Sequence, residues 1–138
     1  MANYNSAFRT NYFRVIDEEA YKKLFENIKS SEGAIFYFTK EKEGEIYHGF
    51  GGDGEGGYVD PEDEDENVNF DYMITEIQKL LPDDECFVYM ETKAEKLRYL
   101  DGYALIATNK GSSFLDLYKW IKDTAEEFGV KNDPSPTY

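Results

Sequence analysis

Alternating apolar and polar residues predict five β-strands along the chain. Each predicted strand is a short run rich in aromatic and β-branched residues, bounded by glycine, proline or charged residues. The runs lie at 11–16, 34–39, 45–50, 85–91 and 97–108. Short charged segments at 40–44 and 92–96 join the second run to the third and the fourth to the fifth. These two pairs of strands are therefore expected to form antiparallel hairpins.

Apolar residues that recur every three or four positions predict three helices. Their apolar faces comprise Tyr21, Leu24, Phe25 and Ile28 within 18–29, Phe70, Met73, Ile74, Ile77, Leu80 and Leu81 in the second helix, and Phe114, Leu117, Tyr118, Ile121, Ala125 and Phe128 in the third. Asp17 is the expected N-cap of the first helix and Asn67 or Asn69 that of the second, because short polar side chains accept bonds from free amide groups there. Ser113 with Asp116 is the expected capping box of the third.

The predicted elements follow the order β-α-β-β-α-β-β-α within a single domain over residues 11–130. Because hairpins connect the strands and alternating βαβ units are absent, we expect an α+β fold: a mostly antiparallel five-stranded sheet with three helices on one face. A chain of 138 residues has the length of one domain and can bury a substantial core. Residues 1–10 are expected to be a flexible N-terminus and residues 131–138 a C-terminal tail.

Residues 51–69 interrupt this pattern and predict a long acidic, glycine-rich loop. Glycine occupies five of the first seven positions, and Pro61–Glu66 has the sequence PEDEDE. Loops of this length in a compact domain are usually functional or disordered. A phosphate-binding loop is disfavoured, because no Lys-Ser or Lys-Thr follows the glycines and because Asp53 and Glu55 would repel a phosphate.

The chain as a whole is strongly negative. It carries 29 Asp and Glu against 15 Lys and Arg, a formal net charge of −14, while 12 Tyr and 10 Phe argue against disorder. Such a protein is repelled by nucleic acids and anionic membranes and is attracted to basic surfaces, including the grooves in which other proteins hold nucleic acid. A contribution to solubility alone is the alternative explanation of this acidity.

The carboxylates are concentrated in one region, which is the expected partner-binding surface. Its residues are Asp53, Glu55, Asp60, Glu62, Asp63, Glu64, Asp65, Glu66 and Asp71. Carboxylates at this density can imitate part of the field of duplex DNA, which carries one charge per ~1.7 Å of its axis. The acids of 83–85 would extend the surface at the other end of the second helix. Tyr58, Phe70 and Tyr72 favour an interface because aromatic residues are enriched there, and a solvated loop without a partner is the alternative.

No motif for catalysis or for a cofactor emerges, so a non-enzymatic protein is expected. His48, the only histidine, lacks a serine or cysteine motif directed at it and is expected at a rim or cross-strand position. A calcium-binding loop that began at Asp63 would place Val68 where glycine is needed and Ile74 where glutamate is needed. Loose, low-affinity binding of divalent cations stays open.

The location expected for this chain is cytoplasmic. No signal peptide precedes the first strand, and no run of 18 apolar residues occurs. A single cysteine, Cys86, rules out an internal disulfide and fits a reducing compartment. Because Cys86 lies in an apolar run, a buried thiol is expected rather than a nucleophile.

Several segments resemble a group of small acidic proteins from mobile elements and prophages of Gram-positive bacteria. The matching segments are Asn11–Val15, Asp17–Glu19, Tyr47–Gly51, Leu80–Glu85, Glu95–Tyr99 and Gly102–Tyr103. The group supplies no catalytic residues. The resemblance implies a counter-defence role of the anti-CRISPR or antirestriction type, with Glu95–Tyr99 as either a second contact surface or a framework turn.

Taken together, these features predict an acidic, non-enzymatic inhibitor that binds a basic nucleic-acid-binding surface of a host defence nuclease. One alternative is an immunity or toxin-neutralising protein that binds a specific effector through shape as much as charge. Another is a low-affinity divalent-cation-binding regulator. Direct contact with nucleic acid or membrane is not expected, and the sequence predicts no particular oligomeric state.

Overall fold

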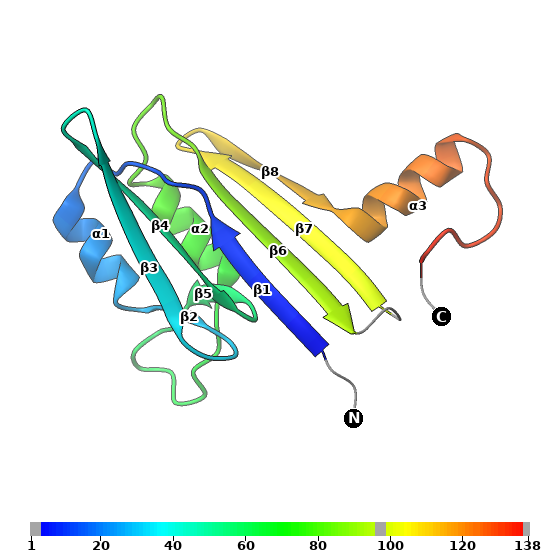
Figure 1. Ribbon diagram of the computed structural model, residues 1–138, viewed down its shortest axis with the longest axis horizontal. Coiled ribbons are helices and arrows are strands. Elements are labelled where there is room, and N and C mark those ends of the chain that lie inside the picture. Colours follow the sequence, from blue (N-terminus) through cyan, green and yellow to red (C-terminus); the bar gives the residue numbers. More distant parts are fainter. Residues whose placement is uncertain (1–3, 96–98, 137–138) are drawn as a thin grey trace.

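The computed structural model describes residues 4–95 and 99–136, which form three helices and two sheets (Figure 1). The elements are β1 (Tyr4–Thr10), α1 (Glu18–Phe25), β2 (Ile28–Ser30), β3 (Ile35–Lys42), β4 (Glu45–Asp53), β5 (Gly56–Tyr58), α2 (Phe70–Gln78), β6 (Phe87–Glu95), β7 (Tyr99–Thr108), β8 (Gly111–Asp116) and α3 (Leu117–Glu127). The main sheet has the strand order β3-β4-β1-β6-β7-β8, and each neighbouring pair is antiparallel. β2 and β5 form a small second sheet.

The expected α+β class, the three helices and the mainly antiparallel pairing are confirmed. β3 and β4 form the first expected hairpin, whose turn residues Glu43 and Gly44 both have positive φ, 54° and 81°. This backbone matches the right-handed twist of the flanking strands. β6 and β7 form the second hairpin. The segment at its turn, 96–98, lies outside the described residues, and with it most of Glu95–Tyr99.

The prediction of a five-stranded sheet was wrong, because the main sheet has six strands in the part of the chain that the structure describes. The first error lies at the centre of this sheet. The first strand is β1, over residues 4–10, instead of the expected 11–16. β1 lies between β4 and β6, so this part of the expected flexible N-terminus is a central strand. Of the β1 side chains whose burial the structure describes, those of residues 5–10, only Phe8 and Thr10 are buried, which explains its weak apolar pattern. Residues 11–16 instead cross the end of the sheet, where Phe13 forms an isolated bridge to His48.

The second error concerns the C-terminal part of the sheet. The residues expected to begin the third helix form β8, an edge strand joined to β7 by a two-residue turn at Asn109 and Lys110. Phe114 packs beside Tyr103 with a ring-centroid distance of 5.4 Å. α3 begins only at Leu117, capped by Asp116. None of the residues of α3 is buried; the apolar face expected to join the core is half-buried at Tyr118, Ile121 and Ala125 and exposed at Leu117 and Phe128.

The region expected to be one loop, 51–69, is also partly ordered into strands. β4 continues to Asp53, and β5 pairs with β2 before the true loop at residues 59–69. The glycines here allow close packing: a Cβ at Gly56 would lie 2.8 Å from the ring of Phe8. Gly54 has a φ of 77°, which a residue with a side chain rarely adopts. The glycine cluster therefore serves the fold.

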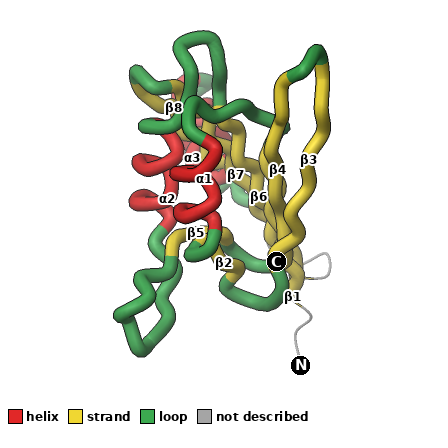
Figure 2. Tube along the Cα trace, turned by 90° about the vertical axis from the view of Figure 1, so that its left-hand side faces the viewer, coloured by secondary structure: helices red, strands yellow, loops and turns green. Residues whose placement is uncertain are grey.

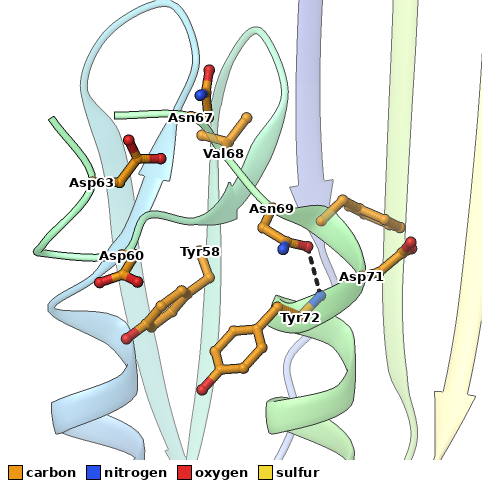
Figure 3. A pocket seen from close by; sticks show the side chains of 9 residues that line it. Tyr58, Asp60, Asp63, Asn67, Val68, Asn69, Asp71 and Tyr72 are labelled. Atoms are coloured by element: carbon orange, nitrogen blue, oxygen red, sulfur yellow. Dashed lines mark hydrogen bonds between the residues drawn. The ribbon is translucent and has the colours of Figure 1, made fainter. Parts of the chain in front are cut away.

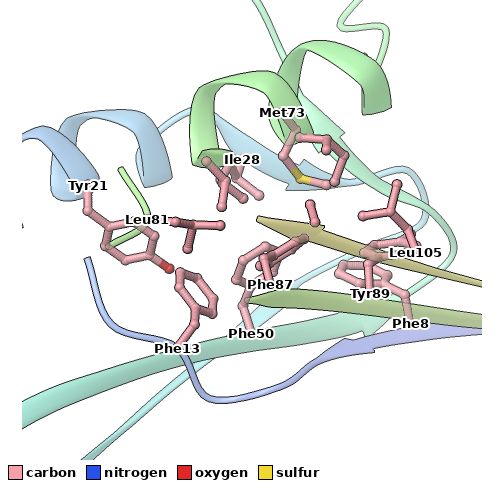
Figure 4. Packing of buried hydrophobic residues seen from close by; sticks show 13 residues of the cluster. Phe8, Phe13, Tyr21, Ile28, Phe50, Met73, Leu81, Phe87, Tyr89 and Leu105 are labelled. Carbon is pink, nitrogen blue, oxygen red and sulfur yellow. The ribbon is translucent and has the colours of Figure 1, made fainter. Parts of the chain in front are cut away.

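The hydrophobic core lies between the main sheet and the layer formed by α1 and α2 (Figures 1 and 2). Its largest fully buried side chains include Tyr21, Tyr89, Phe13, Phe50, Phe87, Ile28, Met73 and Ile77 (Figure 4). Burial of a side chain of this size stabilises a fold by about 1.5–3 kcal/mol. The aromatic rings pack edge to face, as between Phe13 and Phe87, whose centroids lie 5.1 Å apart. α1 and α2 lie on one face of the sheet only, and α3 contacts the sheet near its first turn, where Leu117 lies beside Gly102 of β7.

Candidate partner-binding site

The acidic loop, defined here as residues 59–69, is fixed at both ends to the folded body. The backbone groups of Tyr58 and Asn69 bond each other at 3.0 and 2.8 Å. Val59 donates to the carbonyl of Asn27 at 2.8 Å. The side chain of Asn69 accepts a bond from the amide of Tyr72 and so caps α2. The loop therefore projects from a rigid base on the helix side of the sheet (Figures 1 and 2).

Two consecutive turns shape the acidic loop from within. The side chain of Asp60 accepts a bond from the amide of Glu62, and that of Asp63 accepts one from the amide of Asp65, both at 2.9 Å. Such bonds are the usual reason why aspartate favours turns. Each of these carboxylates uses one oxygen locally. The side chains of Glu62, Glu64, Asp65 and Glu66 are exposed to solvent.

The carboxylates of the acidic loop have no cationic partner among the residues that the structure describes. Among the described residues, no Lys or Arg lies within ion-pair distance of any acid between 60 and 66; the ion pairs found there are at Arg14, Lys22, His48, Lys79, Lys93 and Lys119. Six like charges on one short loop repel one another, and this repulsion is reduced when a cation approaches. The loop is thus a local source of negative potential.

A depression of about 690 Å³ lies between the acidic loop and the start of α2 (Figure 3). Two tyrosines, Tyr58 and Tyr72, stand beside each other in it with ring centroids 4.6 Å apart, and Asp60, Asp63 and Asp71 complete its acidic lining. Burial raises the pKa of Tyr58, with smaller contributions from its neighbours Tyr72, Asp60 and Glu76. The Tyr58 phenol therefore stays neutral at physiological pH.

The structure brings together seven of the nine acids expected at the site. Asp71 lies in the first turn of α2, where the helix dipole favours a carboxylate, and it borders the same depression as Asp60. Asp53 instead ends β4 and lines a separate hollow with Asn5. Glu55 is half-buried, and its charge helps to raise the pKa of Tyr103 in the core. These two acids are not part of the loop surface.

The acids of residues 83–85 do not extend the loop surface either. They lie at the other end of α2 from the acidic loop (Figure 1), and each has a partner. Arg14 pairs with Asp84 at 2.8 Å and with Glu85 at 2.9 Å, while Asp83 accepts a bond from Asn109 at 2.7 Å. These contacts raise the pKa of Arg14, chiefly through its hydrogen bonds to Glu85 and Asp84. The acids of 83–85, which were expected to extend the partner-binding surface, therefore stabilise the fold instead.

His48 lies at a cross-strand position of β4 opposite Thr39 of β3, which is one of its two expected placements, and it is buried rather than at the rim. The residue is 3% exposed. Its Nδ1 lies 2.5 Å from the Tyr37 hydroxyl, in a hydrogen bond, and its Nε2 lies 2.6 Å from a carboxylate oxygen of Glu18. A hydroxyl, an imidazole and a carboxylate in this order resemble a catalytic relay. The imidazole also packs against the ring of Tyr21 at 4.5 Å. The ring is enclosed. Its contacts with Tyr37 of β3 and Glu18 of α1 join these two elements to β4.

Glu91 is a buried acid that the sequence pattern did not single out. Its side chain accepts bonds from the hydroxyls of Tyr89 and Tyr103 and lies 3.5 Å from the amine of Lys93. The hydroxyl of Tyr89 also accepts a bond from the amide of Gly56 in β5. Alternation along β6 could have located it, since Phe87, Tyr89 and Glu91 share the inner face. The cluster anchors β5, and hence the base of the acidic loop.

Three further observations concern cofactors, membranes and relatives. Within residues 4–95 and 99–136, no three His, Cys, Asp or Glu side chains are arranged to hold a metal ion. No helix in that part of the chain is long and apolar enough to cross a membrane. Comparison of the chain with protein-family models, curated proteins and solved structures finds no match.

Proposed function

We propose that this chain is a non-enzymatic inhibitor whose acidic loop binds a basic, nucleic-acid-binding surface of another protein. The observation that carries the proposal is the set of six carboxylates, at residues 60 and 62–66, held on a clamped loop with no cation of the described chain in ion-pair contact. Charged groups that have a structural task in this chain have partners. Those of the loop are available to an external partner.

The density of charge on the loop is comparable with that of a DNA strand. Glu62–Glu66 carries one carboxylate on each residue, and consecutive Cα atoms are about 3.8 Å apart. Phosphates along one DNA strand recur every ~3.4 Å of axis. A surface of Lys and Arg that grips phosphates would therefore meet a similar number of negative charges per unit length. Displacement of its counterions would drive association.

The tyrosines beside the loop support an interface rather than a solvated tail. Tyr72 is exposed and Tyr58 half-buried at the depression. Arg and Lys side chains bind the faces of aromatic rings, and this attraction adds to pairing with carboxylates. A basic partner would thus find both charge and contact area at one place.

The partner class that we propose is a nuclease of a host defence system, in line with the counter-defence role implied by the resemblance. The test is inhibition of DNA cleavage by a panel of RNA-guided nucleases and restriction endonucleases. We expect inhibition of at least one enzyme, relieved by excess duplex DNA, because both ligands would occupy one groove. Failure to inhibit any member, or inhibition that DNA does not relieve, would contradict the proposal.

A matched pair of variants isolates the loop from the overall charge. The loop variant replaces five acids by their amides: Glu62→Gln, Asp63→Asn, Glu64→Gln, Asp65→Asn and Glu66→Gln. The control variant removes five exposed acids elsewhere: Glu19→Gln, Glu26→Gln, Glu32→Gln, Glu41→Gln and Glu43→Gln. Both have the same net charge. We expect at least a hundredfold loss of inhibition in the loop variant and less than a threefold loss in the control.

A further inference from the structure

α3 is an amphipathic helix whose apolar side is only partly covered by the described chain: Leu117 lies against Gly102 of β7, and Ile121 and Ala125 are half-buried. Its apolar side carries Leu117, Trp120, Ile121 and Ala125, followed by Phe128 at the C-cap. None of the residues of α3 is buried, and Trp120 is 56% exposed. The helix extends beyond the edge strand β8, away from α1 and α2 (Figure 1). Because isolated helices of this length are marginal in water, a partner surface for this side is expected.

The outer face of the main sheet, opposite α1 and α2, is such an apolar surface. The strand register places one row of outward side chains across all six strands: Phe36, Gly51, Arg9, Met90, Ala104 and Leu115. Phe36, Met90 and Leu115 are exposed. Next to this row, Leu100 and Ile106 of β7 are exposed as well. Antiparallel sheets that face water usually carry polar residues there, so a patch of this kind marks an interface.

We infer that the outer face binds α3 of a second copy of this chain, in a symmetric dimer. One chain carries both complementary surfaces, which is the requirement for a two-fold interface that closes on itself. The dimensions agree: the 11 residues of α3 span about 16 Å. Four strands at spacings of about 4.8 Å span about 14 Å. α3 can therefore cross the outer face from β8 to β1.

The charges at the edges of the two surfaces are complementary. Arg9 is the only charged residue of the outer row, and its guanidinium lies over the ring of Phe38 at 4.7 Å. Glu127 follows Trp120 by two turns on the same flank of α3, about 10 Å along the axis. Two strand spacings, from Ala104 to Arg9, are also about 10 Å. With Trp120 over the small side chain of Ala104, Glu127 would reach Arg9, and neither has an ion-pair partner among the described residues.

This dimer uses a surface distinct from the acidic loop, and salt affects the two associations in opposite directions. Each copy has a net charge of −14, so added salt screens the repulsion between copies and favours the dimer. Added salt weakens the contact of the acidic loop with a basic partner. The dimer is measured on the purified chain alone, so its failure is distinguishable from failure of the proposed function.

Analytical ultracentrifugation over a range of concentrations tests the dimer. Trp120 is the only tryptophan, and its emission should shift to shorter wavelength as the dimer forms. We expect Trp120→Ala and Met90→Lys each to raise the dimer Kd at least tenfold without a change in Tm, since both residues are exposed. Glu126→Ala, on the polar side of α3, and Thr75→Lys, on the exposed side of α2, are the controls. Arg9→Glu and Glu127→Arg should each weaken the dimer, and together restore it.

Disulfide trapping decides which surfaces meet. In a Cys86→Ser background, one chain carries Trp120→Cys and the other Met90→Cys. A disulfide between the two chains is expected, and its formation in a mixed dimer supports the inference. A monomer at all concentrations, a dimer in which no disulfide forms between the two chains, or a dimer insensitive to Trp120 and Met90 would each overturn it.

Discussion

Two groups of acids in this chain have opposite environments. Glu91 is enclosed by two tyrosine hydroxyls and a lysine, and Glu18 contacts the buried His48. The acids of the loop at 60–66 face solvent with no cation among their described neighbours. The first group holds strands and helices together, whereas the second makes only the local turn bonds of Asp60 and Asp63 and otherwise adds repulsion to the folded state. The acids of this chain therefore fall into two groups: those that stabilise the fold and those that are available for binding.

Removal of Glu91 should have the largest effect on stability. Glu91→Ala leaves the hydroxyls of Tyr89 and Tyr103 without their acceptor and Lys93 without its carboxylate. Loss of one member of a buried charged cluster costs about 3–5 kcal/mol. Urea denaturation measures this loss as a lower midpoint. A midpoint within error of the wild type would show that Glu91 has no structural role.

Substitution of His48 should have the next largest effect. His48→Ala removes a buried ring and leaves the hydroxyl of Tyr37 and the carboxylate of Glu18 without their shared partner. We expect a loss of about 2–3 kcal/mol, from a cavity and broken hydrogen bonds together. Denaturation of His48→Ala measures the cavity and the broken hydrogen bonds together. Denaturation of Tyr37→Phe measures the loss of the Tyr37–His48 hydrogen bond alone. If Tyr37→Phe were as damaging as His48→Ala, the cavity would not contribute.

Alkaline pH should destabilise the group of buried acids and their tyrosines. Burial, then the hydrogen bond to Glu91, raises the pKa of Tyr89 far above its ordinary value. Burial likewise raises the pKa of Tyr21. A raised pKa in the folded state means stability that is complete below pH 10, where the unfolded chain begins to ionise, and is lost as the pH rises further. Thermal denaturation between pH 8 and 11 should show Tm falling only above about pH 10.

Neutralisation of the acidic loop should have the smallest effect on the fold. The five amide substitutions at 62–66 relieve repulsion and touch no ion pair of the described residues. We expect the free energy of unfolding to change by no more than about 0.5 kcal/mol, and in the stabilising direction if at all. Thermal and urea denaturation of the loop and control variants provide the measurement. A loss of more than 1 kcal/mol would place the loop acids in the structural group.

Sequence patterns predicted the elements with strong local signals. The apolar side of α2 and the β3–β4 hairpin follow from periodicity and turn residues, and the loop at 60–66 follows from composition. The sequence pattern does not indicate β1, because Phe8 is its one described side chain in the hydrophobic core. The spacing of Phe114 and Leu117 predicts a helix where the structure has β8. Pairing with β7 makes this segment a strand, and the helical spacing does not reveal that pairing.

The division of the acids was beyond reach of the sequence for a related reason. Asp84 and Glu85 have the same composition signal as the acidic loop, yet they are bound by Arg14, about seventy residues earlier in the chain. Glu55 lies near the loop in sequence but is half-buried, and its charge helps to raise the pKa of Tyr103. Pairing across such separations depends on the topology of the sheet. Of the nine acids expected to lie together, those of the local run at 60–66 and Asp71 do so.

The salt dependence of binding is the most direct test of whether the acidic loop meets the basic surface of the partner. For a nuclease that the chain inhibits, Kd is measured between 50 and ~200 mM salt with the wild type, the loop variant and the control variant. The account predicts a steep rise of Kd with salt for the wild type and the control, and a much shallower rise for the loop variant. Equal slopes for all three proteins would contradict it, because the acidic loop would then not be the surface that meets the basic partner.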